Sequence, residues 1–154
     1  MTPLAELLPQ AAPMILLSGY YPPEESDDFV EAWVAVSEES PFFEPESGGV
    51  PSCVAAEYMA QTMALYTGLY RARTGLPPKV GFLLGTRRLS LKLDRFAAGG
   101  RYRIRVQPLF SDEEFGSFAC TIHDEAMGRE VASALMNAFQ PEGTPTADSL
   151  EAYT

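Results

Sequence analysis

One long apolar helix constrains the fold of this chain more than any other feature. From Ser52 to about Arg73 the sequence is rich in Ala and Met, and no proline interrupts it before Pro77. Ser52 is a suitable N-cap residue. One face carries residues at the spacing i, i+4, i+7 and i+11, namely Val54, Tyr58, Gln61 and Leu65. The neighbouring positions are also mostly apolar, so we expect this helix to lie inside the fold.

Short segments with period-two alternation surround this helix and predict strands. The expected strands are residues 14–17, 29–36, 79–84, 89–93, 101–109, 115–122 and 130–139. Leu4–Leu8 predicts a short helical turn, and residues 40–51, with three prolines and two glycines, predict a loop. Short strands with one apolar face enclose a core by wrapping around the helix. We therefore expect an α+β fold with about six antiparallel strands around one central helix, the last four forming a meander.

The length and the cysteines limit the class of protein. A chain of 154 residues fits one domain, which we place at residues 1–140, followed by a polar C-terminal tail at residues 141–154. Cys53 and Cys120 are not in a C-x-x-C pair, so we expect neither a disulfide framework nor a metal site. The apolar run Met14–Leu17 is too short for a signal peptide or a membrane span, which predicts a cytoplasmic protein.

Charge is distributed unevenly along the chain. The net charge of -10 argues against nucleic acid and anionic membranes as partners. Residues 1–70 contain no Lys or Arg, whereas residues 71–110 hold ten of the eleven basic residues against one acid, Asp94. The fold could gather this basic segment into a docking patch. Within it, Arg101, Arg103 and Arg105 alternate along one predicted strand, which is typical of a solvent-facing sheet surface and alternatively of a docking surface.

Several short strings occur in the order and spacing of a known family. They are residues 8–17 (LPQAAPMILL), Pro41-Phe42-Phe43, the Gly/Pro-rich turn 47–51, and Glu57-Tyr58-Met59-Ala60-Gln61. Over most of residues 7–140 this pattern resembles the hotdog-fold 3-hydroxyacyl-carrier-protein dehydratases of fatty acid synthesis. Together with GGVP at 48–51 and GFLLGTRR at 81–88, it is most similar to the dehydratase-like subunits of aryl polyene biosynthesis.

This resemblance implies a fold, a partner and a reaction. The fold is the hotdog, and the assembly is a homodimer or a heteromer with a second hotdog dehydratase. An acyl carrier protein brings the acyl chain on its phosphopantetheine arm into a tunnel at the interface, and no other cofactor is needed. In such dehydratases a His of the Pro-Phe-Phe loop and a carboxylate on the partner's central helix transfer the two protons. Backbone N–H groups at the helix start polarise the thioester carbonyl.

Only one member of this pair is present here. Glu57 matches the helix carboxylate, and a carboxylate in so apolar a stretch points to a functional role. The family's loop histidine is replaced by Glu46, and the histidine of its opening motif by Gln10. Three interpretations stay open: a dehydratase with Glu57 as its acid or base, a catalytically impaired subunit that pairs with an active dehydratase, and a thioesterase in which Glu57 or Glu46 activates water. Of the three, the resemblance favours the first, an enzyme of the lyase class, although the usual catalytic histidine is absent.

The remaining site residues are predicted around Glu57. Gln61 lies one helical turn further on and is expected to orient Glu57 or to lie at the dimer seam. The other predicted substrate-binding residues are Phe43, Ser52, Cys53, Val54 and Gly85. Arg87 and Arg88 are predicted to dock the acidic carrier protein, the alternative being a solvated strand edge. Cys53 is either a small buried thiol or a nucleophile at the helix start. His123, the one histidine, is expected near a turn and outside the site.

Overall fold

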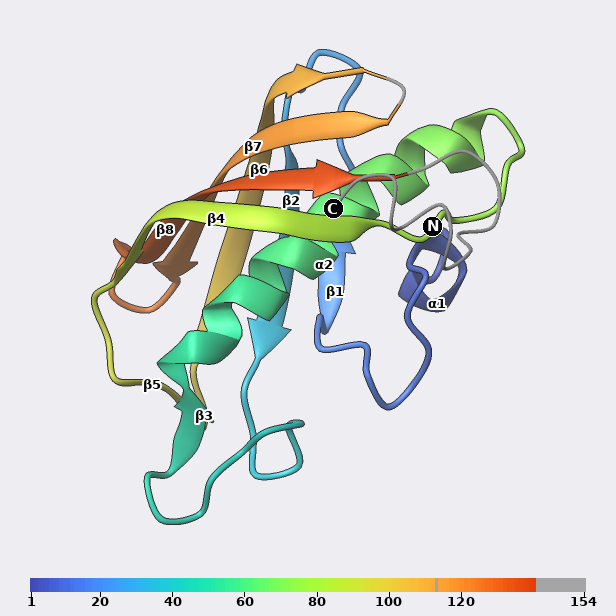
Figure 1. Ribbon diagram of the computed structural model, residues 1–154. Helices are drawn as coiled ribbons and strands as arrows, with labels where there is room; N and C mark the ends of the chain where they lie inside the picture. Colours follow the sequence, from blue (N-terminus) through green and yellow to red (C-terminus); the bar gives the residue numbers. More distant parts are fainter. Residues whose placement is uncertain (113, 141–154) are drawn as a thin grey trace, which may run out of the picture.

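A six-stranded antiparallel sheet curves around one long helix (Figure 1). The computed structural model describes residues 1–112 and 114–140, and the predicted tail 141–154 lies outside them. The elements are α1 (Leu4–Leu7), β1 (Gly19–Tyr21), β2 (Val30–Ala35), β3 (Gly49–Pro51), the 3-10 turn η1 (Ser52–Val54), α2 (Ala55–Arg73), β4 (Phe82–Leu91), β5 (Arg95–Ala97), β6 (Arg101–Ser111), β7 (Phe115–Asp124) and β8 (Arg129–Phe139). The strand order is β1-β2-β6-β7-β8-β4, and β3 pairs separately with β5. The predicted α+β hotdog arrangement is confirmed.

The core lies between α2 and the concave face of the sheet. Alternate residues of β6 point toward the helix, so Tyr102, Ile104 and Val106 are buried while the arginines between them face outward. Leu65 and Met59 of α2 are completely buried against this face. In the part of the chain that the structure describes, no helix combines the length and apolarity that crossing a membrane requires.

The N-terminal segment runs along α2 and is fixed to it at two points. At one point a Cβ atom on Gly68 would collide with the carbonyl oxygen of Leu7, so glycine allows α1 to pack directly on the helix. At the other, the Leu16 N–H donates to Gln61 Oε1 over 2.9 Å. Residues 7–16 therefore run antiparallel to α2, from the level of Gly68 to the level of Gln61.

Two local predictions before and at the start of α2 are wrong. Residues 14–17 are not a strand, because the Leu16 N–H bonds to a helix side chain, and pairing with β2 starts only at Ser18, whose N–H donates to Trp33 O. Ser52 is not the N-cap of α2. It lies in η1, its N–H donates to Asp94 O over 3.2 Å, and no side chain caps α2 at Val54.

The strand prediction after α2 also needs correction. Residues 79–84 and 89–93 were expected to be two strands, but one strand, β4, runs from the second half of the first segment into the second. Its register against β8 shifts between Leu83 and Gly85 and again between Arg87 and Ser90, and these irregularities interrupt the alternation. The meander is right for β6, β7 and β8, whereas β4 pairs with β8 at the far edge of the sheet. The three-residue strands β3 and β5 are too short for their alternation to reveal them.

Candidate functional site

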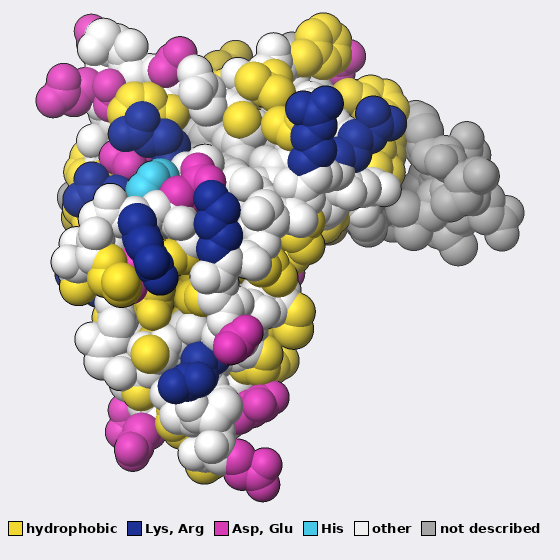
Figure 2. All heavy atoms as spheres, turned by 90° about the vertical axis from the view of Figure 1, so that its left-hand side faces the viewer, with side chains coloured by type: hydrophobic (Ala, Val, Ile, Leu, Met, Phe, Trp, Pro, Cys, Tyr) yellow, Lys and Arg dark blue, Asp and Glu magenta, His cyan; other side chains and the backbone are white. Residues whose placement is uncertain are grey.

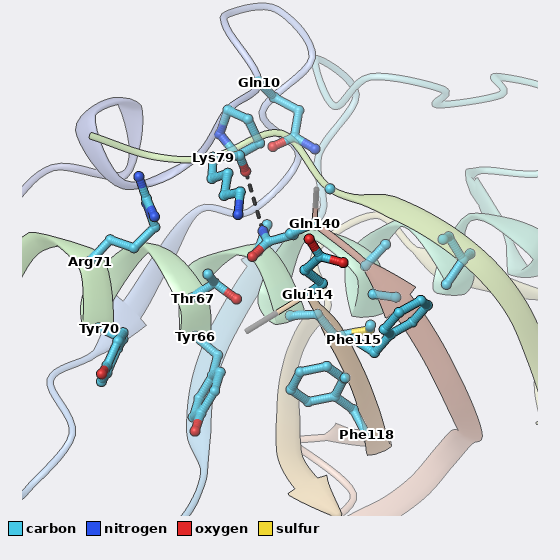
Figure 3. Close-up of a pocket in the computed structure, with 18 of the residues that line it drawn as sticks. Gln10, Tyr66, Thr67, Tyr70, Arg71, Lys79, Glu114, Phe115, Phe118 and Gln140 are labelled. Atoms are coloured by element: carbon cyan, nitrogen blue, oxygen red, sulfur yellow. Dashed lines mark hydrogen bonds between the residues drawn. The ribbon is translucent and has the colours of Figure 1, made fainter. Parts of the chain in front are cut away.

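A cavity of about 780 Å³ follows one face of α2 (Figure 3). The helix lines it with residues at the spacing i, i+3, i+7, i+10 and i+14, namely Glu57, Ala60, Ala64, Thr67 and Arg71. The two alanines leave space beside the helix. At 1.5 Å per residue, Glu57 and Arg71 lie about 21 Å apart along the axis. The cavity is therefore elongated, with a carboxylate near one end and a guanidinium near the other.

The other walls of the cavity differ in polarity. Tyr66 packs edge-on against Phe118 with ring centroids 5.8 Å apart, and Phe115 extends this aromatic wall. The polar side is lined by Gln10, Lys79, Glu114 and Gln140 (Figure 3). Gln140 Nε2 donates to Lys79 O over 3.2 Å. A cavity with one aromatic and one polar side suits an elongated ligand that carries both kinds of group.

Glu57 is held in place by Gln61. Gln61 is completely buried, and its Nε2 donates to Glu57 Oε1 over 3.0 Å and to Met14 O over 2.7 Å. Its Oε1 accepts from the Leu16 N–H. Three hydrogen bonds thus fix this carboxamide, and one of them joins it to Glu57. Glu57 also lies in the first turn of α2, where the helix dipole favours a negative charge.

The one histidine lies on the opposite side of the sheet. On β7, Ile122 is completely buried and faces α2, so the next residue, His123, faces outward. His123 stands opposite Arg103 of β6, on the outer surface. In Figure 2, basic and acidic side chains lie side by side on the face that carries the histidine. The chain therefore supplies no imidazole to the cavity.

Two buried titratable groups, the Tyr58 hydroxyl and the Cys120 thiol, are poor proton carriers at neutral pH. Burial, with a smaller contribution from Tyr102, raises the pKa of Tyr58 to about 12. Burial likewise raises the pKa of the Cys120 thiol to about 12. At the cavity, hydrogen bonds from the backbone N–H groups of Phe115 and Glu114 lower the pKa of Asp112, so this carboxylate stays ionised. Among the described residues no group of three or more His, Cys, Asp or Glu could hold a metal ion.

The other predicted site residues do not line this cavity. Phe43 packs against the core from the loop before β3. Ser52, Cys53 and Val54 form η1, just ahead of α2, and Cys53 is exposed. Gly85 and Arg87 line a second hollow of about 370 Å³, and Arg88 is exposed beside it on β4. Of the predicted residues, the structure thus brings together Glu57 and Gln61.

The arginines of β6 form ion pairs across the outer face of the sheet. Arg101 and Arg103 each bind Glu125, with N–O distances of 2.9 and 3.1 Å. Arg105 binds Glu31 over 3.3 Å. The guanidinium groups also stack on aromatic rings, Arg101 on Trp33, Arg103 on Tyr21 and Arg105 on Phe29. The predicted solvent-facing surface is present, and its positive charge is largely balanced by the acids of β2 and of the turn after β7.

Sequence reasoning missed most of the cavity lining. Arg71 and Lys79 were predicted only as members of the basic segment, Gln140 carried no functional prediction, and Gln10 was interpreted only as a replaced histidine. The available signal was the stripe of small residues, Ala60 and Ala64, in line with Glu57. Such a stripe indicates close approach of some other group to a helix, but only the structure shows that a cavity lies there.

Comparisons with known proteins agree with this architecture. The family model ApeP-like, described as ApeP dehydratase, matches residues 2–151. Among solved structures, the chain is similar to the dehydratase heterocomplex ApeI:P from Xenorhabdus doucetiae, with a TM-score of 0.86 and 29% identity over 99% of this chain and 97% of that one. No curated protein gives a significant match.

More distant structures share the fold alone. The PaaI protein of the Escherichia coli phenylacetic acid degradation operon has a TM-score of 0.56 and 12% identity, over 78% of each chain. A hypothetical thioesterase from Streptococcus pneumoniae, solved with coenzyme A, has a TM-score of 0.57 and 15% identity, over 85% of this chain and 91% of that one. At such identities the likeness extends to the arrangement of helix and sheet.

Proposed function

Because the chain belongs to the ApeP-like dehydratase family, we propose that it is a hotdog dehydratase subunit of aryl polyene biosynthesis, acting on 3-hydroxyacyl thioesters carried by an acyl carrier protein. Three carboxylates line the elongated cavity, those of Glu57, Asp112 and Glu114, and the observation that carries this proposal is that the buried Gln61 holds the first of them. Glu57 is bonded to a fixed Gln61, and the one histidine faces away from it. The chain therefore provides one of the two proton-transfer groups, and another subunit provides the second.

The reaction explains why two groups are needed. Dehydration breaks the C2–H and C3–O bonds and forms a C2–C3 double bond, with water leaving from C3. A base takes the proton from C2, and an acid protonates the leaving hydroxyl. Glu57 fills one of these roles. Gln61 donates to Oε1, which leaves the second carboxylate oxygen free to face the substrate.

We place the second subunit along β4. This edge strand has no strand neighbour on its outer side within residues 1–112 and 114–140. It exposes four leucines, Leu83, Leu84, Leu89 and Leu91. A long edge strand with exposed apolar side chains favours association with another chain. Since ApeI:P is a heterocomplex of dehydratases, a heteromer whose partner carries the catalytic histidine is favoured over a homodimer, which would lack it.

The rim of this interface offers a place for the carrier protein. Arg87 and Arg88 are exposed on β4. Carrier proteins are acidic, so two arginines would attract one and orient its phosphopantetheine arm toward the cavity. In this proposal the arm is part of the substrate, the chain needs no cofactor of its own, and it works in the cytoplasm where carrier-dependent synthesis takes place.

Product analysis tests the proposal. The chain is co-expressed with a histidine-bearing hotdog dehydratase, the assembly is purified, and a 3-hydroxyacyl carrier thioester is added. We expect native mass spectrometry to show a heteromer, and the assembly to form the 2-enoyl thioester faster than the two separate chains combined. Absence of enoyl product from the assembly would refute the proposal. Release of the free 3-hydroxy acid instead would support the thioesterase interpretation.

A further inference from the structure

Gln10 presents a buried acceptor to the cavity. Its Oε1 atom has no hydrogen-bond partner among the described residues, although Gln10 lines the cavity that Glu57 also lines. Buried side-chain acceptors almost always have a partner, and leaving one unpaired destabilises a protein. A ligand that carries an O–H or N–H group into the cavity would satisfy this oxygen.

The path of the N-terminal segment fixes how far Gln10 lies from Glu57. Residues 7–16 run from the level of Gly68 to the level of Gln61, so Gln10 lies beside helix positions 64–67. These positions are seven to ten residues from Glu57, or about 10–15 Å along the helix axis. Figure 3 shows Gln10 across from Gln140 and Glu114, on the polar side of the cavity.

We infer that Gln10 determines ligand specificity by accepting a hydrogen bond from an O–H or N–H group of the bound thioester, about 10–15 Å from the reacting carbons. The inference rests on the proposed function, because it takes Glu57 to mark the position of C2 and C3. Gln10 contacts the ligand away from the reacting atoms and so selects among thioesters without entering the chemistry.

Two donors of such a thioester lie at this distance. An extended chain rises about 1.2 Å per bond. The distal amide N–H of pantetheine is about nine bonds from C2, or about 11 Å. A hydroxyl at the far end of a ten-carbon acyl chain is about eight bonds from C3, or about 10 Å. Both groups would offer Gln10 a single hydrogen-bond donor. The amide lies on the pantetheine side of the thioester and the hydroxyl on the acyl side.

Binding of three unreactive probes separates these sources. The probes are decanoyl-N-acetylcysteamine, which lacks both distal donors, the decanoyl thioester of N-acetyl-β-alanyl-cysteamine, which adds only the distal amide of pantetheine, and 10-hydroxydecanoyl-N-acetylcysteamine, which adds the terminal hydroxyl. None has a 3-hydroxyl group, so none can be dehydrated. Dissociation constants are measured by calorimetry for the full chain, in the assembly it forms in solution.

We expect the wild-type protein to bind one donor-bearing probe about 5- to 10-fold more tightly than the probe without donors. Gln10→Met, which keeps the size and removes the acceptor, should abolish this preference, and Gln10→Glu, which keeps an acceptor oxygen, should retain it. Gln107→Met is the matched control, because Gln107 bonds to Asp28 on the outer face. The preferred probe identifies the donor as the pantetheine amide or the acyl hydroxyl. A wild type without preference, or Gln10→Met that keeps it, overturns the inference.

A stability measurement excludes a purely structural role for Gln10. Replacing an unpaired buried acceptor by an apolar group of similar shape should raise the melting temperature of the ligand-free protein. A lower melting temperature of Gln10→Met would contradict the inference. Because the probes do not react, the two proposals can be refuted separately. If the assembly dehydrates its substrate but Gln10→Met binds the probes like the wild type, the specificity role of Gln10 is refuted. If the wild type prefers a donor-bearing probe but the assembly forms no enoyl product, the proposed function is refuted.

Discussion

Replacement of Gln61 by leucine tests how the chain holds Glu57. Gln61 connects the helix to the N-terminal segment through the Leu16 N–H and Met14 O, and it donates to Glu57. Leucine has a similar volume but can make none of these bonds. Gln61→Leu should therefore both destabilise the fold and free the carboxylate that the proposed chemistry uses.

The expected loss follows from the burial of each partner. The Leu16 N–H bond is buried, and an unpaired buried donor costs about 1–3 kcal/mol. The bonds to Met14 O and Glu57 are only partly buried, so water replaces them at a smaller cost of about 1 kcal/mol together. Leucine regains part of this by apolar burial. We expect the free energy of unfolding to fall by about 1–3 kcal/mol.

Urea unfolding measures this loss, and Thr62→Val is the matched control. Thr62 is also completely buried on α2, but its hydroxyl bonds only to Tyr58 O, one turn earlier in the same helix. We expect Gln61→Leu to lower the urea midpoint by about 1 M or more and Thr62→Val to change it much less. Amide exchange at Leu16 should accelerate selectively in Gln61→Leu. Equal losses for the two variants, with unchanged exchange at Leu16, would refute this reasoning.

Three further predictions concern other parts of the fold. Gly68→Ala should destabilise the protein by about 1–3 kcal/mol in urea unfolding, because the new methyl group meets the Leu7 carbonyl, whereas Gly85→Ala, with open space around its Cβ position, should be close to neutral. Burial opposes the shift at Glu125, but hydrogen bonds from Tyr21 and Arg103 and the charges of Arg101 and Arg103 together lower its pKa. The ionised Glu125 therefore stabilises the fold above about pH 4.5, and this stability is lost as the pH falls through the lowered pKa. Glu125→Gln should flatten the pH dependence of the free energy of unfolding between about pH 5 and 3. A slope equal to that of the wild type would contradict this prediction. A thiol reagent at neutral pH should label the exposed Cys53 quickly and Cys120 only after unfolding, since burial raises the pKa of Cys120 to about 12; rapid labelling of native Cys53→Ser would be the contrary result.

The helix and most strands follow from local patterns in the sequence. The apolar run of α2 and the alternation in β2, β6, β7 and β8 reflect burial on one face, which periodicity records directly. The pairing of β4 with β8 could not be read in this way. A period-two pattern identifies a strand but carries no information about its neighbour, and the bulges near Gly85 and Arg88 disturb even the pattern.

Two residues of the site, Glu57 and the neighbouring Gln61, could be predicted from the sequence. Glu57 is conspicuous because a carboxylate interrupts an apolar helix, and Gln61 follows from the spacing of one turn. The cavity could not be predicted from the sequence, because part of its wall comes from the N-terminal segment, which includes Gln10. This segment is held on α2 by a hydrogen bond between Leu16 and Gln61, which lie 45 positions apart in the sequence. The basic segment shows the same limit. Its arginines on β6 are balanced by Glu31 and Glu125, which lie in acidic segments on either side along the chain.

Turnover of Glu57→Gln in the assembled pair tests the central claim most directly. The wild-type chain, Glu57→Gln and Glu46→Gln are each assembled with the histidine-bearing dehydratase, and formation of the 2-enoyl carrier thioester is followed by mass spectrometry. Glu57→Gln keeps the size and removes the proton-transfer group, so we predict a loss of about 100-fold or more, with intact assembly. Glu46, on the exposed loop before β3, should be replaceable without loss. Unchanged turnover of Glu57→Gln, or an equal loss in Glu46→Gln, would contradict the assignment of Glu57 as the group that this chain contributes.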